Sequence, residues 1–262
     1  MNVSENIAPA LLLTLAAGLC TGIGSAIAYF IRKPKIAYLA FLLGFSAGVM
    51  IYVSFMELMP SALQAVGKFR GLVAFFIGIA AMGLVDILVP EFEHPHQWQT
   101  ADCADEPAAH LEKSRLMRTG LFTALAIGIH NFPEGLAIFT SALSDVHLGI
   151  FIAIAIAIHN VPEGIAVSVP ILYATGDKNK AFFYSFLSGM SEPAGAIVGY
   201  LVLLPFLTPA LLASLLAFVA GVMVYISLDE LLPMAHRYGH GHLVIAGIIL
   251  GMLVMAVSLM IL

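Results

Sequence analysis

Long apolar stretches, separated by short polar clusters, run through almost the whole chain of 262 residues. A helix needs roughly 20 consecutive apolar residues to cross the hydrocarbon core of a bilayer. Divided at the polar clusters, the sequence yields eight predicted spanning helices, at residues 8–31, 38–62, 71–90, 119–142, 149–173, 181–204, 210–235 and 243–262. The pattern therefore predicts an all-α membrane protein that forms a single transmembrane domain over residues 1–262.

The composition agrees with this prediction and excludes other classes of protein. Hydrophobic residues make up 61% of the chain and charged residues 10%, and the mean hydropathy of +1.00 lies outside the range of soluble domains. The net charge of −5 comes largely from one loop and from the spans, so nucleic acid is not an expected partner. Residues 1–9 lack the basic residues of a cleaved signal peptide, so we expect the first run to be retained. Cys20 and Cys103 lie in segments that cannot easily meet, and no disulfide framework is predicted.

The basic residues predict how the helices are oriented. Lys68 and Arg70 lie between the second and third spans, whereas the other nine basic residues lie in connections on the opposite side. Those nine are Arg32, Lys33, Lys35, Lys113, Arg115, Arg118, Lys178, Lys180 and Arg237. By the positive-inside rule the side with nine is cytoplasmic, which puts both termini outside. The long connection, residues 91–118, is then predicted to be a flexible cytoplasmic loop.

An internal repeat relates the second and seventh predicted spans. Residues 48–60 and 221–233 share the pattern Gly-Val-Met-x-Tyr-x-Ser-x-x-Glu-Leu-x-Pro, although the two spans cross the membrane in opposite directions. Opposed copies are typical of an inverted repeat, with spans 1–3 and 6–8 related by an axis in the membrane plane and spans 4 and 5 paired across it. This architecture predicts transport by alternating access.

A second repeat places ionisable side chains deep inside two apolar runs. The hexapeptide His-Asn-x-Pro-Glu-Gly begins at His130 and again at His159. Burying ionisable groups at bilayer depth costs free energy unless they have an interaction partner. Two such motifs therefore imply a partner that both of them share. The predicted symmetry axis would bring the two segments together near the membrane midplane.

Helical spacing makes this site concrete. Residues three and four apart share a helix face, so His130, Asn131 and Glu134 project together, as do their counterparts in the second copy. Pro133 and Pro162 each leave a carbonyl without its helical donor, while Gly135 and Gly164 allow a close backbone approach. Span six adds Glu192, directly before a proline. The predicted ligand set is His130, Asn131, Glu134, His159, Asn160, Glu163 and Glu192.

The chemistry of this set favours a divalent transition metal. Imidazole, carboxylate and carboxamide groups suit Zn²⁺, Fe²⁺, Mn²⁺ or Co²⁺, whereas a soft Cu⁺ site would contain thiolates and a Ca²⁺ site would be an oxygen cage. Three carboxylates exceed the charge of one divalent ion, so a second metal or bound protons would complete the balance. No prosthetic group is predicted, and the metal is expected as transported cargo.

The doubled hexapeptide, the Ser-Gly-x-x-Glu-x-x-Gly stretch in span six, the eight spans and the long third connection resemble the ZIP family of divalent-metal transporters. The resemblance covers essentially the whole chain. It implies uptake of Zn²⁺, and of Fe²⁺, Mn²⁺, Co²⁺ and Cd²⁺, into the cytoplasm across the bacterial plasma (inner) membrane. It also implies that a transport unit of spans one, four, five and six moves against a scaffold of spans two, three, seven and eight.

The resemblance further implies a binuclear site. His130, Glu134, His159 and Glu163 would form one subsite, and Asn131, Asn160 and Glu192 the other, with Glu134 and Glu163 bridging. Some family members place Gln-Asp where this chain has His159-Asn160, so the seven residues as a set are a firmer prediction than their grouping. The predicted partners are divalent metal ions and the lipid bilayer, with a homodimer as an open alternative.

Other interpretations of the sequence stay open. An ion channel could use the same ligands, whereas an enzyme is not predicted, because the chain has no His-Glu-x-x-His helix and the ligands would saturate the ion. The acids near span ends either attract cations or are simply solvated; they are Glu57, Asp86, Asp229 and Glu230. The same choice, between a cytoplasmic metal site and no function, applies to His94, His96, His110, His236, His240 and His242.

Overall fold

The computed structural model describes residues 3–30, 36–88, 108–203, 206 and 208–261, and every regular element within these ranges is helical. The first half contains α1 (Val3–Phe30), α2 (Ile36–Val53), η1 (Ser54–Leu58), α3 (Met59–Val66), α4 (Lys68–Leu88) and α5 (Ala108–Ser144). The second half contains α6 (Val146–Thr175), α7 (Lys178–Gly189), α8 (Ser191–Val198), η3 (Gly199–Leu203), α9 (Pro209–Ile226), η5 (Ser227–Leu231), α10 (Leu232–Arg237) and α11 (Gly241–Ile261). The elements named η are short π-helical stretches.

Six helices in the described ranges are long and apolar enough to cross a membrane, which makes the chain a multi-pass membrane protein. They cover Asn6–Phe30, Ala37–Val66, Lys68–Ile87, Val146–Thr175, Pro209–Arg237 and Gly241–Ile261. The other two predicted spans, 119–142 and 181–204, fall in α5 and in the broken series α7, α8 and η3. That series is interrupted at Met190, because Pro193 has no N–H to donate to the carbonyl of Gly189.

One boundary of the predicted cytoplasmic loop is wrong. Residues 91–118 were expected to be a loop, but α5 already begins at Ala108, so residues 108–118 are helical. This segment contains no Pro or Gly and is rich in Ala, Leu, Met, Glu, Lys and Arg, which are the strongest helix formers. An apolar run marks only the part of a helix that lies in lipid, and therefore misses a polar extension.

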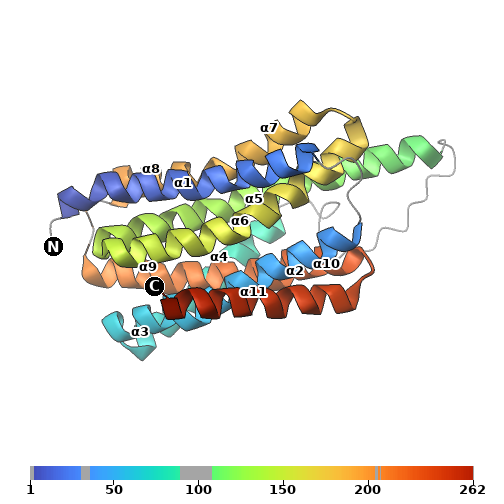
Figure 1. Cartoon of the computed structure of the whole chain (residues 1–262). Helices are drawn as coiled ribbons and strands as arrows, with labels where there is room; N and C mark the ends of the chain where they lie inside the picture. Colours follow the sequence, from blue (N-terminus) through green and yellow to red (C-terminus); the bar gives the residue numbers. More distant parts are fainter. Residues whose placement is uncertain (1–2, 31–35, 89–107, 204–205, 207, 262) are drawn as a thin grey trace.

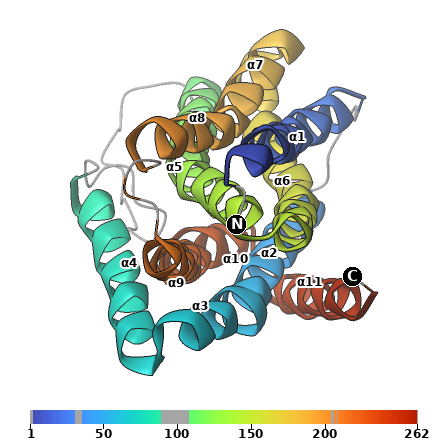
Figure 2. The same cartoon turned by 90° about the vertical axis from the view of Figure 1, so that its left-hand side faces the viewer.

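The helices form two groups around the central pair of α5 and α6. Figure 2 shows α1, α7 and α8 on one side of this pair, and α2, α4, α9 and α11 on the other. We call α1, α5, α6, α7 and α8 the site bundle, and α2, α4, α9 and α11 with the short elements η1, α3, η5 and α10 the flanking bundle. The largest apolar cluster lies between them, with Met50 of α2, Ile156 of α6 and Met223 of α9 among its buried residues.

Glycines bring the paired helices of the flanking bundle into close contact. A Cβ atom added to Gly48 of α2 would lie 2.2 Å from the carbonyl oxygen of Ile248 in α11. A Cβ atom on Gly221 of α9 would lie 2.0 Å from the carbonyl oxygen of Phe75 in α4. These distances leave no room for a methyl group. Gly44, Gly247 and Gly251 make contacts of the same kind between α2 and α11, as is typical of helix packing in membranes.

Candidate functional site

The two hexapeptides lie in α5 and α6, which pack side by side in antiparallel directions (Figure 1). The turn between them is fixed by Asp145, whose side chain accepts hydrogen bonds from the backbone N–H groups of His147 and Leu148 and so caps α6. Because the turn is short, residues equally far from it on the two helices come to the same level. All seven predicted ligands are fully buried, with no exposed surface: His130, Asn131, Glu134, His159, Asn160, Glu163 and Glu192.

The histidines and glutamates of the two copies pair crosswise. His130 Nε2 of α5 lies 3.3 Å from Glu163 Oε2 of α6, and His159 Nε2 of α6 lies 3.3 Å from Glu134 Oε2 of α5. Each carboxylate thus accepts from the imidazole of the other helix. The close approach of these four side chains follows from the four-residue spacing within each motif, which puts His and Glu on the same face one turn apart.

The other three predicted ligands lie toward α1, α7 and α8. Asn160 Nδ2 donates to Glu192 Oε1 at 2.5 Å and to the carbonyl of Ala17 in α1 at 2.9 Å. Asn131 Nδ2 donates to the carbonyl of Ser188 in α7 at 3.4 Å. The carboxylate of Glu192 also interacts electrostatically with Glu134 and Glu163, so the two sets of side chains adjoin each other.

The glycines that end the hexapeptides determine how closely the neighbouring helices approach. A Cβ atom on Gly135 would lie 2.0 Å from the carbonyl oxygen of Glu192, and a Cβ atom on Gly164 would lie 2.1 Å from the carbonyl oxygen of Thr21 in α1. Any side chain at Gly135 would push α8, and with it Glu192, away from α5. The predicted close backbone approach at both glycines is therefore present.

One polar neighbour of the site was not predicted from the sequence. Ser46 of α2 is fully buried, and its Oγ donates to Glu163 Oε1 at 2.9 Å. The signal available was a single hydroxyl between Gly44 and Gly48 in an apolar run, which is too common in membrane helices to single out. Only the packing of α2 against α6 brings Ser46 to the site.

Several ligand atoms in the site have no hydrogen-bond partner, and together they form a set of hard and borderline donors. They are His130 Nδ1, His159 Nδ1, Glu192 Oε2, Asn131 Oδ1 and Asn160 Oδ1. Buried polar atoms are nearly always satisfied, so this concentration points to a cation. In the arrangement described, the acids and imidazoles form pairs, and no three His, Cys, Asp or Glu side chains of the described ranges converge as metal ligands.

Of the acids near the span ends, Glu57 and Glu230 differ in their surroundings. Glu57 is half-buried and accepts a hydrogen bond from Ser61, whereas Glu230 is 7% exposed and interacts electrostatically with His130 and Glu163. Tyr225 donates to Asp86 at 3.3 Å and also interacts with Asp229. Glu230 therefore belongs to the electrostatic environment of the site and is not a solvated end residue.

The loop histidines give no cluster in the part of the chain that the structure describes. His236, His240 and His242 are exposed, and His236 Nδ1 lies 2.8 Å from the carbonyl oxygen of Leu232 in its own helix. His94 and His96 lie outside the described residues, and the side chain of His110 is not described either.

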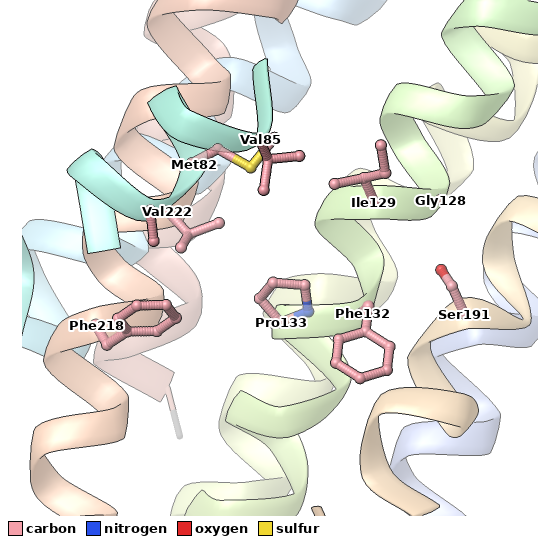
Figure 3. Close-up of a pocket in the computed structure, with 10 residues that line it drawn as sticks. Met82, Val85, Gly128, Ile129, Phe132, Pro133, Ser191, Phe218 and Val222 are labelled. Atoms are coloured by element: carbon pink, nitrogen blue, oxygen red, sulfur yellow. The ribbon is translucent and has the colours of Figure 1, made fainter. Parts of the chain in front are cut away.

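An apolar cavity of about 430 Å³ lies behind the site, on the far face of α5. Figure 3 shows Met82, Val85, Phe218 and Val222 of the flanking bundle facing Ile129 and Pro133 across it. The cavity is open to the surface of the molecule and is lined almost entirely by apolar atoms. It lies at the boundary between the two bundles and separates α4 and α9 from α5 and α8.

Comparisons with known proteins identify the family of this chain. The sequence model of the ZIP zinc transporter family matches residues 88–259. The "Zinc transporter ZupT" of Nitratidesulfovibrio vulgaris is 56% identical, covering 97% of both chains. Proteins of the same name from Clostridium perfringens and Streptococcus mutans are 54% and 52% identical, and each match covers 98% of this chain and 96% or 99% of the relative. The chain therefore belongs to the ZIP family, and is a transporter rather than an enzyme.

Proposed function

We propose that this protein carries Zn²⁺, and with it Fe²⁺, Mn²⁺, Co²⁺ and Cd²⁺, into the cytoplasm through the site between α5 and α6. The observation that carries the proposal is the crossed pairing of two buried imidazoles with two buried carboxylates, each at 3.3 Å. Burying four ionisable groups inside a membrane protein costs free energy, so their presence there indicates a functional role. The names of the similar proteins support zinc as the main cargo.

The donor chemistry supports two metal positions. The His130, Glu134, His159 and Glu163 group offers imidazole and carboxylate donors, the borderline set that Zn²⁺ prefers. The Asn131, Asn160 and Glu192 group offers oxygen donors that suit harder ions, and the two sets adjoin each other through the charges of Glu134 and Glu163. Metal entering the first group replaces the imidazole protons held by the carboxylates, so we expect proton release on binding.

The glycine contacts support eight spans built as an inverted repeat. Gly48 contacts Ile248, and Gly221 contacts Phe75. Gly221 lies 173 residues after Gly48, and Ile248 lies 173 residues after Phe75, so the two contacts are related by one offset. The contacts of Gly78 with Phe218 and of Gly251 with Phe45 follow the same offset. An offset shared by independent contacts is expected when spans 1–3 and 6–8 are copies of each other, with α5 and α6 paired between them.

The same symmetry passes through the metal site. Gly195 of α8 approaches Phe132, and Gly24 of α1 approaches Val161, where Phe132 and Val161 are the third residues of the two hexapeptides. α1 and α8 therefore hold equivalent places beside α6 and α5. This relation supports alternating access, in which the site bundle moves against the flanking bundle and exposes the metal to one face of the membrane and then to the other.

The orientation is part of the same proposal. α1 begins and α11 ends toward the same end of the helices (Figure 1), as an even number of crossings requires. The distribution of Lys and Arg then places both termini outside the cytoplasm, in the plasma (inner) membrane of a bacterium. Residues 89–107, the part of the long connection outside the described residues, would be cytoplasmic.

Replacement of the two bridging acids tests this function. We expect Glu134→Ala and Glu163→Ala to abolish zinc uptake in cells, because each leaves an imidazole without its carboxylate and removes a metal ligand. Asp177→Ala is the matched control, since it removes a carboxylate that only caps the first turn of α7. Uptake is measured with radioactive zinc, and membrane insertion by immunoblot. Wild-type uptake by both glutamate variants would exclude the site.

A further inference from the structure

Ser46 is a polar residue of the flanking bundle that touches the site bundle at a proposed metal ligand. Its hydroxyl donates to Glu163 Oε1 at 2.9 Å, and neither residue has any exposed surface. The hydrogen bonds described above for the other predicted ligands come from helices of the site bundle itself, and Glu230 of η5 adds only an electrostatic interaction. The hydrogen bond from Ser46 therefore crosses the boundary along which the two bundles are proposed to move.

The two bridging carboxylates are not equivalent because of this contact. The two oxygens of Glu163 have different partners, Ser46 at Oε1 and His130 at Oε2, whereas both oxygens of Glu134 lie 3.3 Å from the same atom, His159 Nε2. The internal repeat explains the difference. Gly44-Phe-Ser-Ala-Gly48 of α2 corresponds to Ala217-Phe-Val-Ala-Gly221 of α9, so buried Val219 stands where a symmetric protein would have a second serine.

We propose that Ser46 is a positioning residue that orients Glu163 for metal binding. It does so only while α2 and α6 keep the relative position that they have in this structure. The inference rests on the proposed function and adds a consequence for it. Hydrogen bonds to ligating carboxylates strengthen metal binding. A shift of about 1 Å between α2 and α6 would take the 2.9 Å contact out of hydrogen-bond range. The affinity for metal is then higher in this state than after the bundles have moved, which favours release.

The test compares two variants of nearly identical shape. Ser46→Thr keeps the hydroxyl, whereas Ser46→Val replaces it with a methyl group of similar size, and Val219 shows that valine fits the equivalent place in the repeat. Purified full-length protein is titrated with Zn²⁺ by equilibrium dialysis. We expect Ser46→Val to raise the Kd for zinc about tenfold, and Ser46→Thr to remain within about twofold of wild type.

Uptake kinetics provide a second measurement that a general packing defect would not reproduce. We expect Ser46→Val to raise the KM for zinc by about the same factor while Vmax changes less than about twofold, because only ligand positioning in this state is lost. Val219→Ala is the control for a change of volume at the equivalent buried position, and should leave KM unchanged.

The outcomes separate this inference from the function on which it rests. If wild-type protein binds no zinc, the proposed function fails and the role of Ser46 fails with it. If wild-type protein binds zinc and Ser46→Val binds it with the same Kd as Ser46→Thr, the function stands and the role of Ser46 is excluded. Equal weakening in Ser46→Thr and Ser46→Val would also exclude it, because the hydroxyl would then be irrelevant.

Discussion

At the scale of single residues, the site pairs its buried acids with hydrogen-bond donors. His130 and His159 each supply an N–H to a carboxylate of the opposite helix, and Asn160 supplies one to Glu192. An unpartnered carboxylate at this depth would cost several kcal/mol. The amide of Asn160, a proposed metal ligand, thus also supports the buried carboxylate of Glu192.

The dual role of Asn160 leads to a prediction about metal-dependent stability. In Asn160→Asp, a carboxylate would face Glu192 and the Ala17 carbonyl, which are both acceptors. Loss of about 2 kcal/mol in hydrogen bonding should lower the melting temperature of metal-free protein by roughly 5 °C. Added zinc should stabilise the variant more than wild type, because Asp is the stronger ligand.

Thermal unfolding in detergent, with chelator and then with zinc, measures this effect. Asn179→Asp makes the same chemical change at an exposed position in the first turn of α7, and should change neither melting temperature by more than about 1 °C. A variant at Asn160 that is as stable as wild type in chelator would contradict the prediction.

The sequence predicts which side chains lie close together better than it predicts how they pair. Helical spacing puts His130 and Glu134 on one face, and the repeat does the same for His159 and Glu163. The crossed partners depend on the register of α5 against α6. The contact between Ser46 and Glu163 depends on the packing of α2. Neither arrangement is encoded in local spacing, so neither could be predicted.

At the scale of elements, hydropathy located the six helices of the described ranges that can cross a membrane, but not the irregular turns within them. η1 and η5 occupy equivalent places in the repeat, where the N–H groups of Met59 and Leu232 bond to the carbonyls of Ser54 and Ser227, five residues back. Pro60 and Pro233 follow directly, and each removes one ordinary helical hydrogen bond. A π-helical turn before a proline does not change the hydropathy of an apolar run. The sequence therefore predicted a continuous α-helix there.

Helix pairing depends on glycines at the contact points, and Gly221 provides a test. In Gly221→Ala, the new methyl group would lie 2.0 Å from the carbonyl oxygen of Phe75 and 3.1 Å from the backbone nitrogen of Ile79. Backbone atoms cannot rotate aside, so α9 must separate from α4. We expect a loss of about 1 to 3 kcal/mol, measured as a lower melting temperature and faster proteolysis.

The matched control lies on another helix of the same bundle. Gly241 begins α11 and has nothing within 4 Å of an added Cβ atom, so Gly241→Ala should leave the melting temperature within about 1 °C of wild type. Equal destabilisation by both substitutions would mean that helix propensity, and not close packing, sets the effect.

At the scale of the whole molecule, two bundles meet along surfaces of different character. On one side α2 packs against α6 through buried apolar residues and the hydrogen bond of Ser46 to Glu163. On the other side the cavity of about 430 Å³ separates part of α4 and α9 from α5. The cavity is open to the surface of the molecule, so the bundles are not packed against each other here and have room to move.

Filling the cavity should therefore slow transport without disturbing the proposed metal ligands. Ala81 of α4 lines the cavity, and in Ala81→Phe the added ring would occupy space between the bundles. We expect Vmax for zinc uptake to fall at least about fivefold, while the Kd for zinc measured by equilibrium dialysis stays within about twofold. The neighbouring Ala80 is exposed, so Ala80→Phe adds the same volume on the outer face of α4 and should transport normally. Uptake by Ala81→Phe at the wild-type rate would mean that the bundles move without using this space, whereas an equal loss in both variants would assign the effect to α4 itself.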